Sequence, residues 1–356
     1  MSKEPTILSI ETSLDDTCAA VTRGTRVLSN IVSSQTRYHE EWGGTVPDIA
    51  KRLHKEWLPK VVALALKSAG NPNLSAIAVT IGPGLAPSLE QGIDFGKNLA
   101  ISRKLPIIAV NHLEGHLLAP YAKTRRGTRG LTNPVYPALG FLISGGHTEL
   151  VLMRGIGEYK LLGGTLDDAA GEAYDKVARM LLLGYPGGPI LAEMAKSGKP
   201  IYRLPEPMTN RKDLNFSFSG LKTAARHFLE RDLPADEEGK PALTKEFIQD
   251  FAASFQDAVF RHLMKRFRLA IELHSPHMIL LGGGVVSNVA LRKLARQTAK
   301  ECALDVHIPY SKKLFTDNAA MIGVTASFKF ARAEFTDPRS LDRLPNLNFP
   351  KSSAPL

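Results

Sequence analysis

The segment Thr6-Ile-Leu-Ser-Ile-Glu-Thr-Ser-Leu-Asp-Asp-Thr17 gives the clearest indication of the fold and of a site within it. Residues 6–10 are mostly apolar and β-branched, which predicts a buried strand. The strand ends in hydroxyl and carboxylate side chains, and α/β folds bind their ligands at the carboxyl ends of strands. Such a turn can hold a phosphate group through Thr12, Ser13 and backbone N–H groups, and Asp15 and Asp16 can handle a proton or the water of a metal ion. The alternative is a solvent-exposed hairpin turn.

Strands and helices alternate along the rest of the chain. Apolar periodicity predicts strands at residues 76–80, 107–110, 138–144, 149–153 and 278–281, and helices at residues 48–69, 88–103, from 288 and from about 317. Residues 167–270 have a helical pattern almost throughout. Each half of the chain starts with β-rich runs followed by glycine turns, so we predict a duplicated pair of α/β lobes with a cleft between them.

The composition is that of a globular protein. The 356 residues are 44% hydrophobic and 22% charged, which excludes disorder as the dominant state and fits two or three domains. No apolar run approaches the roughly 20 residues that span a bilayer. The two cysteines, Cys18 and Cys302, lack metal-ligand spacing, which argues against a disulfide scaffold or a thiolate zinc site. Because the start of the chain resembles neither a signal peptide nor a transit peptide, we expect a cytoplasmic protein without membrane contact.

The chain is basic, with 45 lysines and arginines against 35 acidic residues and a formal charge of +10. Such a surplus attracts polyanions, nucleic acid first among them; a merely basic surface is the alternative. No aromatic residues interleave with the basic clusters, which favours contact with phosphates over stacking on bases. The clusters are Arg125, Arg126 and Arg129; Arg261, Lys265, Arg266 and Arg268; and Lys293, Arg296 and Lys300.

The sharpest local feature is His112-Leu-Glu-Gly-His116, directly after a predicted strand. Histidines at i and i+4 lie on one face of a helix and can share one metal ion. The motif differs from that of zinc proteases, because Glu114 lies one position later than the glutamate of that motif. A carboxylate is the expected third ligand, and Asp317 is the candidate. The alternative role for Asp317 is to cap the helix that follows it.

Four glycine turns form the next feature. Glycine permits positive φ and a close approach of the backbone to a ligand. Any one of them is an ordinary turn, but together they predict a nucleotide in a cleft lined by glycine turns. Their spacing fits neither a P-loop nor a Rossmann fingerprint. The four are Gly82-Pro-Gly84, Ser144-Gly-Gly-His-Thr148, Gly184-Tyr-Pro-Gly-Gly-Pro189 and Gly282-Gly-Gly284.

A helix with a charged face is predicted around Asp168, Glu172, Asp175 and Lys176, which are spaced three and four residues apart. A solvated helix face is the ordinary interpretation of such a pattern. The stretch Ala169-Ala-Gly171, however, would let this helix pack closely against backbone or a ligand. Asp175 could then reach ribose hydroxyls or a threonine-like amine.

The motifs occur in an order that resembles one family. In chain order they are Glu11-Thr-Ser-Leu-Asp-Asp-Thr17, Gly43-Gly-Thr-Val-Pro47, Gly82-Pro-Gly-Leu85, His112-Leu-Glu-Gly-His116, Ser144-Gly-Gly-His-Thr148, Asp168-Ala-Ala-Gly-Glu-Ala-Tyr-Asp-Lys176, Tyr185-Pro-Gly-Gly-Pro189, Phe216-Ser-Phe-Ser-Gly-Leu-Lys222, Gly283-Gly-Val-Val-Ser-Asn288 and Thr316-Asp-Asn-Ala-Ala-Met321. Up to about residue 333, the chain resembles the TsaD family of tRNA N6-adenosine threonylcarbamoyltransferases.

The resemblance implies an α/β fold of the actin-like ATPase (ASKHA) class, with two lobes and a central cleft. We expect an N-terminal lobe at residues 1–120 and a C-terminal lobe at 121–313, with a helical insertion at about 165–275. Residues 314–345 would return as a helix to the N-terminal lobe. Residues 346–356 would form a disordered tail.

The resemblance also implies a reaction and partners. The family moves a threonylcarbamoyl group from threonylcarbamoyl-AMP to N6 of the adenosine 3′ of the anticodon, position 37, in tRNAs that read ANN codons. The products are t6A and AMP. Bacterial members work with a TsaB-like paralogue and a TsaE-like ATPase, whereas mitochondrial members act as homodimers; the start of this chain favours the bacterial arrangement.

By resemblance, the metal ligands are His112, His116 and Asp317, holding one divalent ion, iron or zinc. Asp15 and Asp16 match acidic positions that the family needs for transfer. The residues expected to bind the adenylate substrate are Leu142, Ile143, Ser144, Gly145, Gly146, Asp175, Gly188 and Asn288.

The chain departs from the family pattern at a few positions. Leu14 and Phe315 stand where the family usually has cysteine, and Ala192 replaces an aspartate that contacts the ribose in many members. The Ala192 change predicts a weaker ribose contact.

Three other functions are possible for such a sequence: an actin-fold kinase or ATPase, a metallopeptidase and a non-catalytic scaffold. The histidine pair argues against the first, because such enzymes hold Mg²⁺ with oxygen ligands.

Overall fold

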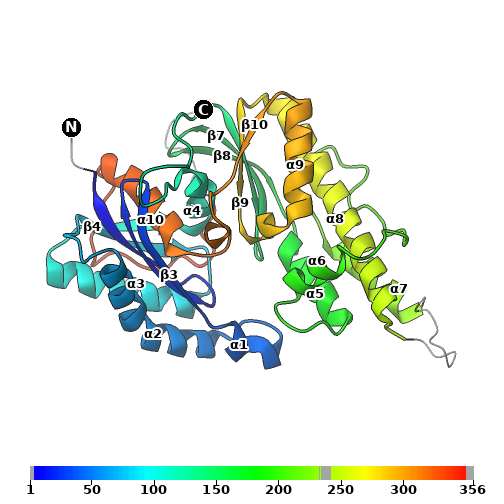
Figure 1. The fold of residues 1–356 in the computed structure, drawn as a ribbon, viewed down its shortest axis with the longest axis horizontal. Helices are drawn as coiled ribbons and strands as arrows, with labels where there is room; N and C mark the ends of the chain where they lie inside the picture. Colours follow the sequence, from blue (N-terminus) through cyan, green and yellow to red (C-terminus); the bar gives the residue numbers. More distant parts are fainter. Residues whose placement is uncertain (1–3, 232, 234–241, 350–356) are drawn as a thin grey trace.

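The computed structural model describes residues 4–231, 233 and 242–349. They form two lobes side by side, each built on a five-stranded sheet (Figure 1). The first sheet has the order β3-β2-β1-β4-β5, and the second the order β10-β9-β6-β7-β8. When the second order is followed from β8 to β10, the two sheets match strand for strand. The predicted duplication of an α/β lobe is therefore confirmed.

The first sheet contains an antiparallel hairpin and a parallel half. Its strands are β1 (Thr6–Glu11), β2 (Asp16–Arg23), β3 (Arg26–Ser34), β4 (Ala76–Gly82) and β5 (Ile107–Asn111). β1 pairs antiparallel with β2 and parallel with β4, which pairs in parallel with β5. The carboxyl ends of β1, β4 and β5 therefore lie at one edge of the sheet, where ligand-binding residues are expected.

The second sheet repeats this arrangement. Its strands are β6 (Ala138–Ile143), β7 (Thr148–Gly155), β8 (Glu158–Gly164), β9 (Met278–Gly282) and β10 (Asp305–His307). β6 pairs antiparallel with β7 and parallel with β9, just as β1 pairs with β2 and β4. The hairpin strands β2, β3 and β8 were absent from the sequence prediction, because their polar residues weaken the apolar pattern.

Helices cover both faces of the first sheet. On one face lie α2 (Pro47–Ser68) and α3 (Ala86–Arg103), which pack with Leu8 and Ile10 of β1. On the other face lies α10 (Ala319–Ala331), which packs with Ile7. This alternation along β1 is the period-two pattern of a strand buried on both sides. The short helices α1 (Thr36–His39) and η1 (Glu40–Trp42) connect β3 to α2.

The second lobe carries five helices that share one hydrophobic core with Leu139, Phe141 and Ile143 of β6. They are α5 (Ala170–Met180), α6 (Gly187–Met194), α7 (Ser219–Arg231), α8 (Lys245–His274) and α9 (Val289–Glu301). Three short 3-10 segments complete the described structure: η2 (Ala119–Tyr121), η3 (Gly284–Ser287) and η4 (Lys312–Leu314).

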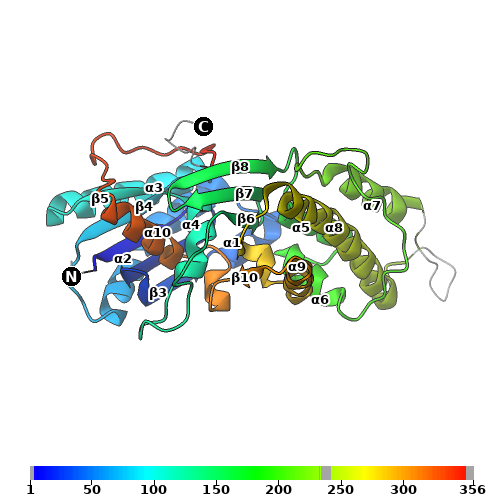
Figure 2. The ribbon, with the colours of Figure 1, turned by 90° about the horizontal axis from the view of Figure 1, so that it is seen from above.

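The helix α4 (His112–Leu118) lies between the two sheets (Figures 1 and 2). Leu113 and Leu117 share a hydrophobic core with Leu142 of the second sheet and with Val324 of α10. A Cβ added to Gly140 of β6 would lie 2.3 Å from the Leu117 side chain, so glycine allows α4 to approach the sheet closely. α4 is therefore held by both lobes at once.

The helix α5 packs against the turn that joins β6 to β7. A Cβ added to Gly171 would lie 2.7 Å from the carbonyl oxygen of Ser144 and 2.8 Å from Cα of Gly145. The predicted close packing of this helix is thus directed at backbone. The prediction that Asp168 shares a helix face is wrong, because α5 begins at Ala170. Asp168 instead accepts hydrogen bonds from Lys176 and Lys222 at 2.6 Å each.

The end of the chain also differs from expectation. After α10, residues 341–349 run as an ordered strap along the first lobe, where the amide of Leu344 donates to the carbonyl of Ile81 at 2.7 Å. The Asn111 side chain donates to the carbonyl of Asn348 at 2.9 Å, and Phe349 packs edge-on against Tyr159. A disordered tail is therefore wrong for residues 346–349, and residues 350–356 lie outside the described part. Across the described ranges, no helix combines the length and apolarity needed to cross a membrane.

Substitution of Gly171 tests the close approach of α5. We expect Gly171→Ala to lower the free energy of unfolding by about 1–3 kcal/mol, because the added methyl group overlaps backbone atoms that cannot rotate away. Gly220→Ala in α7 is the matched control, since its Cβ would meet no atom within 4 Å. That change should be neutral or stabilise by up to about 1 kcal/mol. Urea unfolding of both variants decides the matter; equal stabilities would contradict the packing described.

Candidate active site

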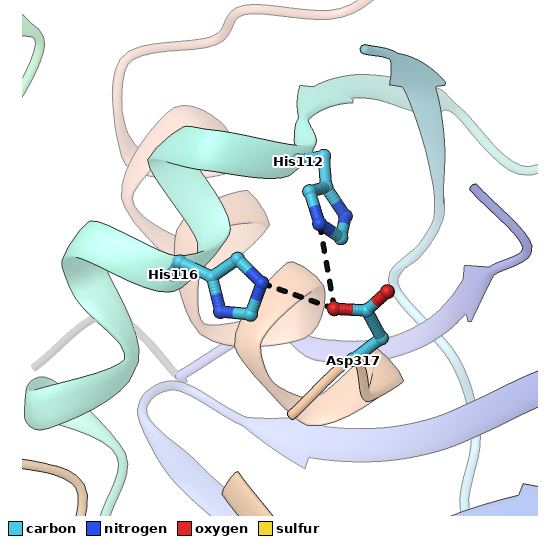
Figure 3. Close-up of side chains that lie close together, drawn as sticks. All are labelled: His112, His116 and Asp317. Atoms are coloured by element: carbon cyan, nitrogen blue, oxygen red, sulfur yellow. Dashed lines mark hydrogen bonds and ion pairs between the residues drawn. The ribbon is translucent and has the colours of Figure 1, made fainter. Parts of the chain in front are cut away.

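The candidate site begins at the junction of β5 and α4. The side chain of Asn111 accepts hydrogen bonds from the amides of Leu113 at 2.8 Å and Glu114 at 3.2 Å, so α4 starts directly at the end of the strand. This places His112 and His116 one turn apart on the buried face of the helix. Their rings are perpendicular, with centroids 4.7 Å apart (Figure 3).

The third member, Asp317, comes from the loop before α10. Its Oδ1 lies 3.1 Å from Nε2 of His116 and 3.5 Å from Nε2 of His112. The alternative role as a helix cap is wrong, because Asn318 is the N-cap of α10 and accepts from the amide of Met321 at 3.1 Å. The carboxylate of Asp317 is therefore directed at the histidines.

This cluster has the composition and spacing of a metal site. Three ligand atoms, one each from His112, His116 and Asp317, lie within 4.8 Å of one another. Two imidazole nitrogens and a carboxylate oxygen are a donor set used for zinc and non-haem iron, and differ from the all-oxygen sets that hold Mg²⁺ or Ca²⁺. The residues present therefore fit one transition-metal ion.

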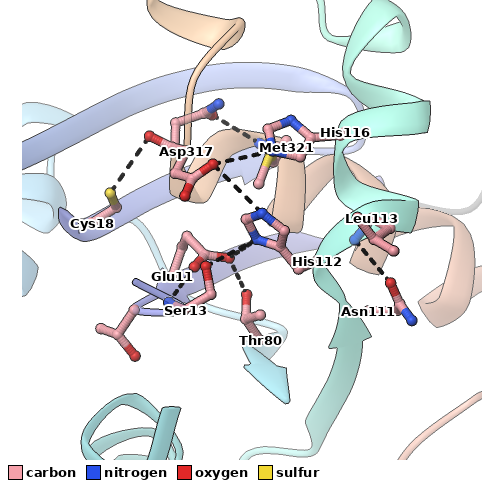
Figure 4. Close-up of polar contacts among 12 residues, drawn as sticks. Glu11, Ser13, Cys18, Thr80, Asn111, His112, Leu113, His116, Asp317 and Met321 are labelled. Atoms are coloured by element: carbon pink, nitrogen blue, oxygen red, sulfur yellow. Dashed lines mark hydrogen bonds and ion pairs between the residues drawn. The ribbon is translucent and has the colours of Figure 1, made fainter. Parts of the chain in front are cut away.

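A second carboxylate, Glu11, fixes the orientation of His112 (Figure 4). Its Oε2 lies 3.0 Å from Nδ1 of His112 and accepts a hydrogen bond from the Thr80 hydroxyl at 2.6 Å. Its Oε1 accepts from the amide of Ser13 at 2.5 Å. With Nδ1 held by Glu11, Nε2 of His112 faces Asp317, which is the arrangement that orients metal-binding histidines. The sequence analysis gave Glu11 no role. The signal available in the sequence was a carboxylate directly after the buried strand predicted at residues 6–10.

The charges in the cluster depend on one another. Burial lowers the pKa of His112, but the carboxylates of Glu11 and Asp317 outweigh it and raise that pKa to about 9. Against the effect of burial, the imidazoles hold the pKa of Asp317 well below its ordinary value. Burial, with the charge of His112, lowers the pKa of His147 to about 4. The metal-free cluster therefore holds an imidazolium between two carboxylates, and a metal ion would take the place of that proton.

The turn between β1 and β2 brings Asp15 and Asp16 to the same region. Burial, reinforced by the charge of Asp317, raises the pKa of Asp15 to about 6. Burial is also the main cause that raises the pKa of Asp16 to about 7. The segment is a hairpin turn, as the alternative proposed, with Thr12 and Ser13 buried, Asp15 and Asp16 half-buried and Leu14 exposed. Its two hydroxyls have partners within the protein, since Thr12 donates to the carbonyl of Ser88 and Ser13 contacts Nδ1 of His112.

The turn after β6 presents open backbone. Ser144 Oγ accepts from the amide of His147 at 3.1 Å, while Gly145 and Gly146 are exposed, with no atom within 4 Å of an added Cβ. The side chains of Leu142 and Ile143 are buried in two different hydrophobic cores. Those two predicted substrate-binding residues can therefore contact a ligand only through their backbone.

The remaining predicted residues have partners within the protein. Asp175 on α5 accepts from the amide of Gly188 at 2.7 Å, and burial raises the pKa of Asp175. Asn288 caps α9 by accepting from the amide of Ala290 at 2.9 Å, and its amide donates to Gln256 at 2.7 Å. The amide of Glu172 in α5 also donates to the carbonyl of Gly145 at 3.1 Å, so Asp175 lies one turn from that glycine turn.

The fold and the site define a class of protein: a two-lobed actin-like protein with a buried His-His-Asp cluster where the lobes meet. Similar solved structures agree on the fold. HypF of T. kodakarensis aligns with a TM-score of 0.61 at 12% identity, over 94% of this chain and 49% of that chain. Component A of the (R)-2-hydroxyglutaryl-CoA dehydratase of Acidaminococcus fermentans aligns with a TM-score of 0.51 at 13% identity, over 92% and 99%.

Sequence comparison then gives the family. The family model for tRNA N6-adenosine threonylcarbamoyltransferase matches residues 26–324. Relatives of that name share 44% identity in Thermodesulfovibrio yellowstonii, over 93% of this chain and 96% of the relative, and 40% in Carboxydothermus hydrogenoformans, over 96% and 97%. The chain belongs to the family of tRNA N6-adenosine threonylcarbamoyltransferases, which are transferases that modify tRNA.

The raised pKa of Asp16 predicts a pH dependence of stability. The folded metal-free protein holds a proton on Asp16 up to about pH 7, whereas the unfolded chain releases it near 3.8, the ordinary pKa of an aspartate. Ionisation of Asp16 therefore costs the wild type stability as pH rises through this window, and Asp16→Asn lacks this contribution. We expect the melting temperature of Asp16→Asn relative to wild type to increase between pH 5 and pH 8.

The matched control for this measurement is Asp94→Asn, which removes an exposed carboxylate from α3. Its melting temperature relative to wild type should stay constant over the same range. A constant difference for Asp16→Asn as well would show that Asp16 ionises freely in the folded protein.

Proposed function

We propose that this chain transfers a threonylcarbamoyl group from threonylcarbamoyl-AMP to N6 of adenosine 37 in tRNAs that read ANN codons. The N6 amine attacks the carbamoyl carbon, the bond from that carbon to the phosphate oxygen breaks, and AMP leaves with the electron pair. The amine loses one proton, and t6A is formed. The observation that carries this proposal is the His-His-Asp cluster beside two partly buried carboxylates, in a chain of this family.

His112, His116 and Asp317 would hold one divalent ion, and their mixed nitrogen and oxygen donors favour iron or zinc. Such an ion supplies Lewis acidity, which polarises a carbonyl group and stabilises negative charge that develops on its oxygen. Glu11 keeps Nδ1 of His112 occupied at 3.0 Å and so presents the opposite nitrogen to the ion. The metallopeptidase alternative gains no support, since Glu114 is buried and accepts from Tyr159 at 2.9 Å.

Asp15 and Asp16 are suited to accept the proton of the attacking amine. Their pKa values, raised to about 6 and about 7, lie close to neutral pH, where a general base combines availability with sufficient basicity. A carboxylate with an ordinary pKa near 4 would be a much weaker base.

The adenylate would lie along the second lobe. The exposed backbone at Gly145 and Gly146 allows a nucleotide to approach closely, and Asp175 lies one turn along α5 from that turn. Asp175 can accept from ribose hydroxyls, and the amide of Gly188 lies beside it, donating to its carboxylate at 2.7 Å. Asn288 at the start of α9 is the further proposed contact. Ala192 lies on α6 and is half-buried against the hydrophobic core of the second lobe, so it offers no polar contact to a ribose.

The proposed setting is the cytoplasm, with tRNA as the acceptor. A TsaB-like paralogue and a TsaE-like ATPase are the expected partners, and a homodimer is the alternative. Both arrangements are tested by adding the partners to the assay described next.

The central test is transfer of labelled threonylcarbamoyl from its adenylate to a tRNA with an ANN-decoding anticodon, with and without the two partners. We expect His116→Ala to lower transfer at least a hundredfold and to reduce bound metal from about one ion per chain to almost none, because two ligands rarely retain such an ion. His227→Ala, an exposed histidine on α7, is the control and should keep both activity and metal. Full transfer by a metal-free His116→Ala would contradict the proposal.

Glu11 gives a separate prediction about metal affinity. Glu11→Gln keeps the size of the side chain but weakens its hold on His112, so affinity for zinc should fall about 10- to 100-fold. Competition with a coloured chelator measures this without any enzyme assay. Glu158→Gln, exposed at the start of β8, serves as control. An unchanged affinity for Glu11→Gln would assign Glu11 a purely structural role.

A further inference from the structure

Two of the three basic clusters of the sequence, those on α8 and α9, differ in how their charges are used. On α8, the cations are neutralised by neighbouring acids: Arg261 pairs with Asp257, Lys265 with Glu206 and Arg268 with Glu301, at 2.9, 3.1 and 2.7 Å. Arg266 is buried and donates to the carbonyls of Asn215 and Met208. This cluster has little charge to offer a polyanion.

A second group has no such partners. Lys293, Arg296 and Lys300 on α9, with Lys312 and Lys313 of η4, are all exposed, and none lies within 4 Å of an acidic side chain in the described residues. We call these five residues the α9 basic face. Residues 288–313 contain six lysines and arginines but only two acids, Glu301 and Asp305, and Glu301 is already paired with Arg268.

The helix geometry aligns these charges. Lys293, Arg296 and Lys300 follow one another at intervals of three and four residues, which places them on one side of α9. The opposite side is buried in the core of the second lobe through Leu291, Ala295 and Ala299. Arg296 and Lys300 also line an open surface hollow of about 430 Å³, together with residues 303–306.

The α9 basic face is joined to the loop that carries Asp317. Lys313 precedes Asp317 by four residues, and the guanidinium of Arg292 lies 5.3 Å over the ring of Phe315. Arg292 also donates to the carbonyl of Ser287 at 2.8 Å, which holds its guanidinium at the start of α9. Figures 1 and 2 both place α9 and the segment before α10 on the same side of the molecule.

We propose that the α9 basic face binds the phosphate backbone of the tRNA and guides it to the candidate active site. The inference rests on the proposed function and adds the surface that receives the acceptor. When unpaired, exposed lysines and arginines contact the phosphates of a nucleic acid, the counterions condensed on those phosphates are released. This release is a major source of affinity for nucleic acids. A membrane is the less suitable partner, because the apolar side of α9 is buried in the protein rather than free to enter lipid.

The test measures binding of an unmodified tRNA transcript to the full chain by filter binding between 50 and 200 mM KCl. We expect Arg296→Glu/Lys300→Glu to weaken binding at least tenfold at the lowest salt and to reduce the slope of log K against log salt by about 2. The control is Lys67→Glu/Arg103→Glu, the same pair of substitutions at exposed last-turn residues of α2 and α3. It should change affinity less than twofold.

The possible outcomes separate this surface from the reaction. The proposal is overturned if the wild type binds no tRNA or if both double variants lose affinity for tRNA equally. Binding of the same proteins to phosphatidylglycerol vesicles is measured in parallel. The proposal is also overturned if Arg296→Glu/Lys300→Glu loses binding to these vesicles while its affinity for tRNA is unchanged. Weakened tRNA binding by Arg296→Glu/Lys300→Glu supports the surface even where the wild type transfers no threonylcarbamoyl group, in which case only the reaction fails. Normal binding and modification by this variant would leave the reaction in place and remove the surface.

Discussion

The arrangement of this protein depends on a buried group of charges at the junction of its two lobes. Glu11, His112 and Asp317 belong to segments about 100 and 200 residues apart, yet they meet within hydrogen-bonding distance. Burying any one of these charges alone would cost several kcal/mol, so each requires the others or a metal ion. The cluster therefore links β1, α4 and the loop before α10.

The duplicated fold explains why this position is available. The helices α4 and α10 fill the space between the inner faces of the two sheets. α4 must then be short and must approach β6 closely, which Gly140 permits. The carboxyl ends of both sets of parallel strands open near the same junction, so the turn at Asp15 and Asp16 and the glycine turn after Ser144 border one region.

Much of this architecture follows from local sequence signals, whereas its long-range contacts do not. The strands and helices with strong apolar periodicity were predicted close to their observed bounds, and the spacing of His112 and His116 indicated one helix face. Whether Asp317 was a ligand or a helix cap depended on Asn318 and on packing across the lobes. The role of Glu11 and the burial of Phe349 likewise depend on contacts between distant segments. The apolar periodicity of the sequence is a local pattern and does not predict such contacts.

The junction cluster has the ligands of a metal site. Anomalous diffraction from crystals of the metal-loaded protein, collected at the iron and zinc edges, shows whether a metal ion binds there. We expect one strong peak about 2.0–2.2 Å from Nε2 of His112, Nε2 of His116 and the carboxylate of Asp317. A fully loaded protein whose only peak lies elsewhere, with both histidines still hydrogen-bonded to Asp317, would contradict this expectation.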